Sequence, residues 1–396
     1  MKILIINDFY EKGGAEVQAR LEMDLLKKKG HQVLLITFDP AFETGWLSES
    51  KDAFNVQRKD GSLDKLLDKI RPNCKVKRVV KKLMRSFSPD AIRLENCIKE
   101  TPAVFGVLKK WKGIPFVQTM HDFGYVCPLT GYCAKLPTWE ECPGFFAIGE
   151  RCTCRENGFV WKKLKTFEVR RYRKLVRKFG IRLLTPSKAL EKKLNQNGFA
   201  ATTVPNLYPL EEKGGVPPKK DGFIFVGNLT RQKGVIPLLK AFVALGPGHK
   251  LDVVGPVAPD IQNEVNEICN AKPNVVFHGK QSHEETLQYL RQAKFLIVPS
   301  LWMENYPNAI LESFAAGTPV LGSSRGGIAE MIGDESLTFD VLSQESMISC
   351  IKASEGIDGS AYLAIVQRNK DYLLQNNDPE IYYQSIMEAI NDAKPK

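Results

Sequence analysis

Short apolar runs alternate with amphipathic stretches from the start of the chain. Residues 2–6 and 32–37 are apolar runs of strand length, and residues 16–29 between them carry hydrophobic positions at helical spacing. The side chains on the apolar side of that helix are Val17, Leu21, Leu25 and Leu26. A strand, a helix and a second strand in this order predict a parallel sheet covered by helices.

The same alternation resumes after a loop-rich polar linker that follows residue 204. Further apolar runs of strand length in the second half occupy residues 223–227, 250–255, 275–279 and 295–299. We therefore predict an α/β chain with two doubly wound, Rossmann-like parallel-sheet domains in series. Residues 1–205 form the first domain and residues 206–375 the second.

The most informative stretch follows the last of these runs. A loop with Glu304 comes first, and Pro307 then suits the start of a helix, where its missing N–H costs nothing. The free N–H groups of Asn308 and Ala309 would make a positive helix N-terminus that can bind an anion. Glu312, inside the helix, can bend back toward the same ligand. Two carboxylates thus flank a phosphate-sized hole.

Together with the preceding strand, the Pro-Asn-Ala helix start and the Ala-Ala-Gly-Thr-Pro exit at 315–319, this stretch resembles the Glu-x7-Glu signature of family 4 retaining glycosyltransferases, also called glycosyl transferases group 1. The alternative is an ordinary αβ unit with solvated glutamates. The resemblance implies the GT-B fold, with two domains facing across a cleft. It also implies that residues 376–396 form a helix crossing back to the first domain.

Other parts of the chain carry the same resemblance in the same order. Gly13 and Gly14 precede a helix, and the resemblance implies that this loop faces the donor diphosphate. His121 follows a predicted strand at residues 114–120, at the sheet edge where ligands bind in open α/β sheets. A lone histidine is otherwise a core or surface residue. The resemblance implies that His121 is the acceptor-side histidine.

A basic turn follows the first strand of the second domain. Arginine and lysine at such a strand end can clamp diphosphate oxygens. Lys233 matches the family pattern, whereas Asn228 stands where the family usually has arginine. Arg231 is the candidate for the second charge, although it can equally belong to a charged turn.

The resemblance implies transfer of a sugar from a nucleotide-diphosphate sugar to an acceptor hydroxyl, with retention of the anomeric configuration. His121 and Glu304 are the predicted catalytic residues. The predicted donor-binding residues are Gly13, Gly14, Arg231, Lys233, Asn305, Tyr306, Pro307, Asn308, Ala309 and Glu312. No metal or other cofactor is expected to be required for catalysis. The expected acceptor is a sugar or a lipid-linked oligosaccharide in cell-surface polysaccharide, lipopolysaccharide or glycolipid synthesis.

Composition adds a partner and a location. The net charge is +11 over 396 residues, which favours anionic partners. Residues 161–179 hold nine Lys or Arg and one acid, Glu168, and residues 75–85 form a second basic helix. These helices are either solvated faces or contacts with an anionic membrane. No apolar run approaches the ~18 residues of a membrane helix, so we expect a cytoplasmic protein, peripheral at the inner face of the cell membrane.

An unusual segment at residues 126–155 contains five cysteines and little helical or strand period. They are Cys127, Cys133, Cys142, Cys152 and Cys154. A structural zinc site and plain reduced thiols are both open interpretations, and disulfides are less favoured in the cytosol. The segment follows His121 directly, so it should border the acceptor end of the cleft.

Three other function classes remain to be distinguished. A nucleotide-sugar epimerase of the same fold would convert the donor without an acceptor. A non-catalytic sugar- or nucleotide-binding protein would lack the donor clamp, which the Asn228 departure leaves open. Nucleic acid is not an expected partner, because the chain shows no aromatic and basic recognition motif.

Overall fold

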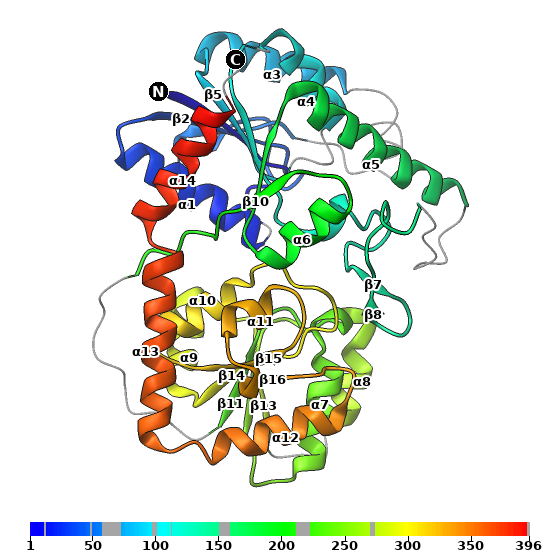
Figure 1. Ribbon diagram of the computed structural model, residues 1–396, viewed down its shortest axis with the longest axis vertical. Helices are drawn as coiled ribbons and strands as arrows, with labels where there is room; N and C mark the ends of the chain where they lie inside the picture. Colours follow the sequence, from blue (N-terminus) through cyan, green and yellow to red (C-terminus); the bar gives the residue numbers. More distant parts are fainter. Residues whose placement is uncertain are drawn as a thin grey trace.

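The computed structural model describes residues 1–11, 13–47, 50–57, 73–96, 101–111, 113–149, 159–210, 222–269 and 274–393. Two parallel sheets, each covered by helices, lie one above the other along the long axis of the molecule (Figure 1). Each sheet has its own hydrophobic core, as the alternation of apolar runs and amphipathic helices predicts. None of the helices in these ranges combines the length and apolar character needed to cross a membrane.

The first domain is built on a sheet in the order β10-β9-β6-β5-β1-β2-β4-β3, parallel except at β3. Its strands are β1 (Lys2–Ile6), β2 (Gln32–Thr37), β3 (Gly45–Leu47), β4 (Ser50–Asn55), β5 (Ala91–Leu94), β6 (Phe116–Thr119), β9 (Arg182–Thr185) and β10 (Ala201–Thr203). Its helices are α1 (Gly14–Lys28), α3 (Cys74–Phe87), α4 (Thr101–Leu108), α5 (Phe159–Phe179) and α6 (Lys188–Gln196). The small hairpin of β7 (Ala134–Lys135) and β8 (Glu140–Glu141) lies outside this sheet.

The second domain has a wholly parallel sheet in the order β13-β12-β11-β14-β15-β16. Its strands are β11 (Phe223–Val226), β12 (Leu251–Val254), β13 (Val275–Gly279), β14 (Phe295–Val298), β15 (Val320–Ser323) and β16 (Thr338–Phe339). Its helices are α7 (Val235–Leu245), α8 (Gln262–Cys269), α9 (His283–Gln292), α10 (Asn308–Ala315), α11 (Gly327–Ile332), α12 (Gln344–Glu355) and α13 (Gly359–Asn376). In each sheet, successive strands are added first on one side and then on the other side of the domain's first strand, β1 or β11. This is the Rossmann arrangement, and it places ligands at the carboxyl ends of the strands.

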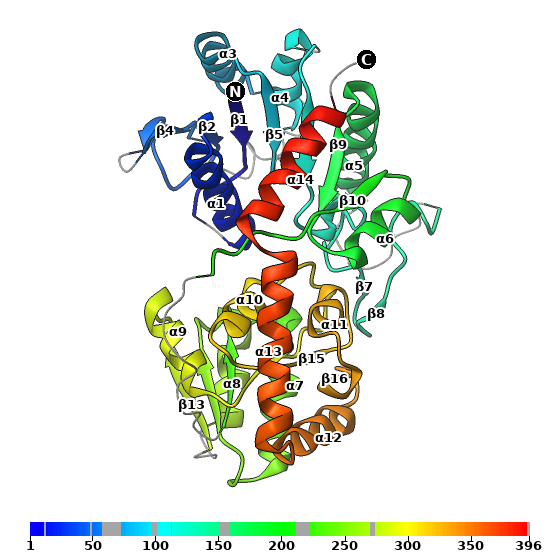
Figure 2. The ribbon, with the colours of Figure 1, turned by 60° about the vertical axis from the view of Figure 1, so that its left-hand side comes forward.

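The end of the chain returns to the first domain. Helix α13 runs along the second domain, and α14 (Pro379–Asp392) continues onto the first (Figure 2). The Asp378 side chain caps α14 by accepting hydrogen bonds from the backbone N–H groups of Glu380 and Ile381. Tyr382, Ile386 and Ile390 are buried in the core of the first domain, so α14 is part of that core.

The buried face of helix α1 differs from the predicted one. Leu25 and Leu26 are buried, but Val17 is exposed and Leu21 is only partly buried. Glu22 is instead buried on this helix, where its carboxylate accepts two hydrogen bonds from the guanidinium of Arg93 on β5. The periodicity therefore identified the helix but misplaced part of its buried face.

Candidate active site

A cavity of about 500 Å³ opens between the two domains, within the range of small-molecule sites. Residues from the carboxyl ends of both sheets line it, as the topology requires. The predicted site residues that line it are Gly14, His121, Lys233, Glu304, Asn305, Tyr306, Pro307, Asn308, Ala309 and Glu312. Of the predicted set, Gly13 and Arg231 do not line it.

Glu304 is held rigidly in the loop after β14. Its Oε1 accepts hydrogen bonds from Lys233 Nζ at 2.5 Å, Trp302 Nε1 at 2.7 Å and Ser300 Oγ at 2.9 Å. Its Oε2 accepts none from the described residues. One oxygen therefore orients the carboxylate, and the other can accept a hydrogen bond from a ligand hydroxyl.

Two glycine turns explain why Lys233 and Glu304 meet. Gly234 has φ +71°, and a Cβ there would lie 1.7 Å from the carbonyl oxygen of Pro299 at the end of β14. Gly326 has φ +57°, and a Cβ there would lie 2.2 Å from the Glu304 carbonyl oxygen. Only glycine fits at either position. The two turns therefore pack directly against the backbone of Pro299 and of Glu304.

The N-terminus of α10 is open to the cavity. Its cap is Pro307, which supplies no side-chain hydrogen bond, so the first N–H groups at Asn308 and Ala309 remain available to an anion. Across the cleft lies the double-glycine loop. A Cβ on Gly14 would come within 3.2 Å of Asn308 Nδ2, so the absence of a side chain there permits the two domains to approach.

Glu312 lies on the cavity side of α10, and its side chain is 19% exposed. Burial raises the pKa of its carboxyl group to about 7. The imidazole Nδ1 of His283 lies 3.8 Å from Oε1 of Glu312. Glu312 therefore has an acceptor oxygen ready for ligand hydroxyls, at a cost in desolvation.

His121 faces this apparatus from the first domain, just after β6. Its Nε2 lies 2.5 Å from Glu95 Oε2, and the side chain is 7% exposed. With Glu95 Oε2 accepting a hydrogen bond from Nε2–H, Nδ1 is the ring nitrogen left for a ligand. The sequence identified His121 but not Glu95, because no local pattern connects them.

The side chains of two predicted donor residues are held by hydrogen bonds within the protein. Asn305 bonds the first domain, with Oδ1 2.5 Å from Ser187 Oγ and Nδ2 3.0 Å from the His121 carbonyl oxygen. The Tyr306 hydroxyl lies 2.9 Å from that of Tyr372 on α13, and burial raises its pKa to about 12. Asn305 thereby joins the two domains, Tyr306 joins the loop to α13, and both residues line the cavity.

Arg231 is placed elsewhere. It is half-exposed in the short turn before Lys233, and its Nη1 lies 2.9 Å from Glu264 Oε2 on α8. Asn228 lines the cavity instead. In this conformation the single lysine, without a second basic side chain from that turn, faces the cavity.

The cysteine segment is described only in part. Cys127, Cys133 and Cys142 are buried and form no disulfide, whereas Cys152 and Cys154 lie outside the described residues. Within the described ranges no group of three or more His, Cys, Asp and Glu side chains is arranged to hold a metal ion. The zinc interpretation stays a prediction.

The same segment reaches the second domain, a contact that the sequence did not reveal. The Tyr132 carbonyl oxygen accepts a hydrogen bond from the Met303 N–H at 3.0 Å. The Tyr132 ring packs edge-on against the Trp302 ring, with 5.2 Å between the ring centroids. Arg325 donates to the Trp139 carbonyl oxygen. The insert therefore packs beside the loop that carries Glu304.

Two Rossmann-like domains that face each other across a cleft, with an open helix N-terminus and a basic residue in it, have the architecture of the GT-B glycosyltransferases. Family models support this directly. Residues 12–212 match the model "Glycosyltransferase Family 4", and residues 209–352 match "Glycosyl transferases group 1". The chain belongs to the glycosyltransferases that these models describe.

Solved structures share this fold over the whole chain. The sucrose-phosphate synthase of Thermosynechococcus elongatus has a TM-score of 0.76 at 16% identity, covering 99% of this chain and 98% of that one. Anabaena Alr3699/HepE, solved in complex with UDP and glucose, has a TM-score of 0.71 at 19% identity, covering 99% and 100%. At these identities the likeness concerns the fold.

Curated relatives match over shorter stretches. The uncharacterized glycosyltransferase MJ1607 of Methanocaldococcus jannaschii is 32% identical over 31% of this chain and 32% of its own length. The lipopolysaccharide 1,2-N-acetylglucosaminetransferase of Salmonella typhimurium is 28% identical over 35% and 40%. The matches span about a third of the length of these relatives.

Proposed function

We propose that the protein transfers a sugar from a nucleotide-diphosphate sugar to an acceptor hydroxyl, with retention of the anomeric configuration. The observation that carries this proposal is one cavity in which Lys233, the open α10 N-terminus, Glu304 and Glu312 face His121 across the domain boundary. Each group suits one part of such a donor.

The departing diphosphate would bind on the second domain. Negative charge grows on it as the glycosidic bond breaks, and preorganised positive groups stabilise that charge. Lys233 Nζ and the N–H groups of Asn308 and Ala309 supply them, which is why no metal ion is proposed as a cofactor for this step. We expect transfer to continue at an unchanged rate in EDTA, and a loss that added metal reverses would contradict this part of the proposal.

The sugar and the nucleoside would bind on either side of that diphosphate. Glu312 would accept hydrogen bonds from ribose hydroxyls, and the free Oε2 of Glu304 would accept one from the donor sugar. His121 would contact the sugar from the acceptor side. Positive charge that develops on the sugar ring is stabilised by the Glu304 carboxylate, whose orientation Ser300 and Trp302 fix.

The experiment is a thermal-shift panel of nucleotide sugars, followed by turnover assays on those that bind. Transfer to an added acceptor, with the product anomer assigned by NMR, supports the proposal. Conversion of the donor sugar without an acceptor would identify an epimerase instead. Binding without any turnover would identify a non-catalytic binding protein.

We further propose cell-surface polysaccharide, lipopolysaccharide or glycolipid synthesis as the setting, with a sugar or lipid-linked acceptor presented at the inner face of the cell membrane. The similarity to a lipopolysaccharide N-acetylglucosaminetransferase favours this setting. The UDP complex of a structural neighbour makes UDP-sugars the first donors to test.

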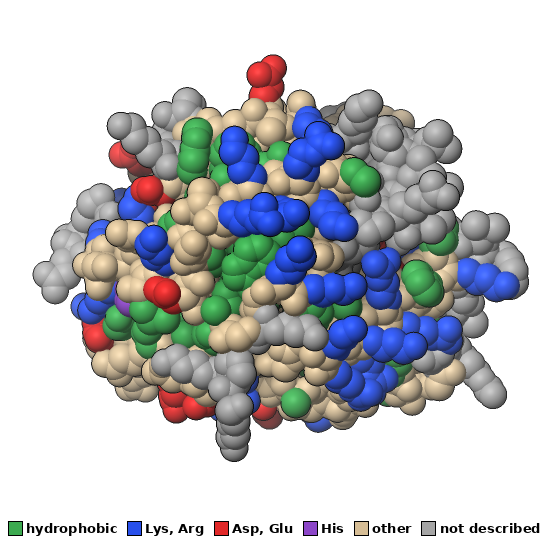
Figure 3. Space-filling model, turned by 90° about the horizontal axis from the view of Figure 1, so that it is seen from above, with side chains coloured by type: hydrophobic (Ala, Val, Ile, Leu, Met, Phe, Trp, Pro, Cys, Tyr) green, Lys and Arg blue, Asp and Glu red, His purple; other side chains and the backbone are tan. Residues whose placement is uncertain are grey.

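A basic groove supports membrane docking. It has a volume of about 340 Å³, lies between α3, α4 and α5, and is lined by Lys77, Lys109, Arg171 and Lys178 around Phe105 and Leu175. None of the four cations forms an ion pair with a carboxylate in the described part of the chain. Lys and Arg side chains gather around apolar ones on this end of the first domain (Figure 3), a pattern that suits anionic lipid headgroups.

A further inference from the structure

A buried cluster of charged side chains ends at His121. Arg93 on β5 is 0% exposed, and its guanidinium donates to Glu22 Oε1 at 2.7 Å, to Glu22 Oε2 at 2.8 Å and to Glu95 Oε1 at 2.8 Å. The other oxygen of Glu95 is the partner of His121 Nε2. Arg93 also donates to Thr119 Oγ1 at 2.8 Å, at the end of β6. Each Glu95 oxygen therefore has its own partner.

The cluster continues to the far end of the chain. The Tyr382 hydroxyl on α14 donates to Glu22 Oε2 at 2.5 Å, and the Tyr382 side chain is buried. The result is a continuous chain of hydrogen bonds from α14 through α1 and β5 to the cavity. Its members are Tyr382, Glu22, Arg93, Glu95 and His121.

We propose that Glu95 is the positioning residue of His121, and that Tyr382 on α14 holds Glu95 in place through Glu22 and Arg93. The returning C-terminal helix thereby sets the orientation of the imidazole in the cavity. The inference rests on the proposed function for the catalytic use of His121, but the positional coupling itself is independent of it.

Physical reasons favour positioning over simple stabilisation. Removing ions from water costs as much as their attraction returns, so a buried ion cluster is a poor source of net stability. A carboxylate that holds one imidazole nitrogen fixes the tautomer and the ring orientation at once. If one donor is removed from a buried cluster, a carboxylate oxygen loses its hydrogen bond. The neighbouring side chains then shift, because a buried oxygen without a hydrogen bond is costly.

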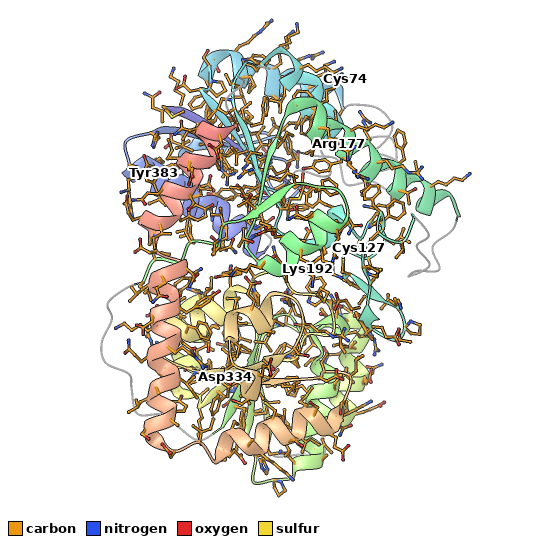
Figure 4. The ribbon with its side chains drawn as sticks, viewed as in Figure 1. Cys74, Cys127, Arg177, Lys192, Asp334 and Tyr383 are labelled. Atoms are coloured by element: carbon orange, nitrogen blue, oxygen red, sulfur yellow. The ribbon has the colours of Figure 1, made fainter. Side chains whose placement is uncertain are left out.

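The chain contains a matched control on the same helix. The Tyr383 hydroxyl lies 3.0 Å from Nε2 of His31 in the first domain. Tyr383, labelled in Figure 4, thus joins α14 to a different histidine, outside the buried cluster. The substitutions Tyr382→Phe and Tyr383→Phe each remove one hydroxyl from α14 and keep the ring.

The test is NMR of the protein with 15N-labelled imidazoles, of which the chain has five, with His121→Asn to assign the His121 signals. We expect Tyr382→Phe and Glu95→Gln to shift the His121 ring resonances and Tyr383→Phe to shift those of His31. A folded Tyr382→Phe protein with unmoved His121 signals would overturn the coupling. Equal shifts of His121 in both tyrosine variants would reduce it to general packing of α14.

Kinetics then separate the coupling from the function. On a donor that turns over in the panel, Glu95→Gln should lower kcat about tenfold or more with the donor KM unchanged, and should have no further effect in the His121→Asn background. An unchanged kcat in Glu95→Gln would refute the catalytic role. A parent protein without turnover would refute the proposed function, while the NMR shifts still decide the coupling.

Discussion

At the scale of single residues, Glu312 shows that a group placed to bind a ligand can lower the stability of the folded protein. Glu312 keeps a carboxyl group in a partly desolvated position, with a pKa raised to about 7 by burial. A folded-state pKa above the ordinary value means that ionisation of Glu312 opposes folding. The same desolvation strengthens the hydrogen bonds that its oxygens can make to a ligand.

Glu312→Gln should therefore stabilise the protein in a pH-dependent way. Below the pKa of Glu312 in the unfolded chain, the carboxyl group is protonated in both the folded and the unfolded state, so the variant has no advantage in free energy of unfolding. The advantage grows as the pH rises from that value to about 7, and it is complete at higher pH. The ceiling is about 3 kcal/mol, at 1.36 kcal/mol for each unit of pKa shift. Urea unfolding at several pH values measures it, and a gain that does not rise with pH would show that ionisation is not the cause.

Residue roles were predictable where the signal is local. Glu304, Glu312 and the helix start between them lie within one strand, loop and helix, so their spacing alone places them together. Asn305 and Arg231 were not predictable in this way, because their partners Ser187 and Glu264 lie on other elements. Side-chain direction in a loop depends on such partners.

At the scale of elements, hydrophobic runs located the strands well. The predicted strands at residues 2–6 and 32–37 have the bounds of β1 and β2, since a run buried on both faces is a strong signal. The buried face of α1 was partly wrong, because Glu22 is compensated by Arg93, 71 positions away. An apolar pattern cannot reveal a buried ion pair.

The basic groove makes a prediction about α5. Arg171→Glu should weaken binding to anionic liposomes, measured by sedimentation, by roughly 2 kcal/mol. The substitution changes the charge by two, and each basic charge at the surface contributes about 1 kcal/mol. Lys192→Glu is the matched control: it makes the same charge change on α6, at the side of the first domain nearest the second (Figure 4). Equal binding by both variants, or equal binding of the parent to neutral liposomes, would leave the groove as a solvated face.

The cysteine segment makes a second prediction at this scale. If it holds a structural zinc ion, the purified protein should contain about one equivalent of zinc by elemental analysis. Cys133→Ser should lose the metal, whereas Cys74→Ser, an exposed cysteine on α3, should keep it. Metal-free parent protein with freely titrating cysteines would exclude the zinc site.

At the scale of the whole molecule, the site exists only because two domains meet. Asn305 of the second domain bonds Ser187 and the His121 backbone of the first. The Glu330 carboxylate accepts hydrogen bonds from the N–H groups of Lys188 and Ala189 at the start of α6, at 3.0 and 3.1 Å. These contacts, together with α14, set the distance between the cavity residues of the second domain and His121 of the first.

The domain arrangement follows from the fold, but its contacts do not follow from the sequence. Alternating strands and helices predict two parallel sheets. The cap that Glu330 makes on α6 joins residues more than a hundred positions apart, and neither end shows a periodic pattern. Such contacts form where two finished surfaces meet, so local propensity carries no information about them.

The most direct test of the whole account is calorimetric titration of nucleoside diphosphates into the parent protein and Lys233→Ala, with the matching nucleosides as the control. The account predicts that the variant loses ~1.5–3 kcal/mol of diphosphate affinity, the worth of a charge-assisted hydrogen bond, and binds the nucleoside as the parent does. Equal diphosphate affinities in the two proteins would contradict it, because the cavity would then bind its ligand without the cation that defines it.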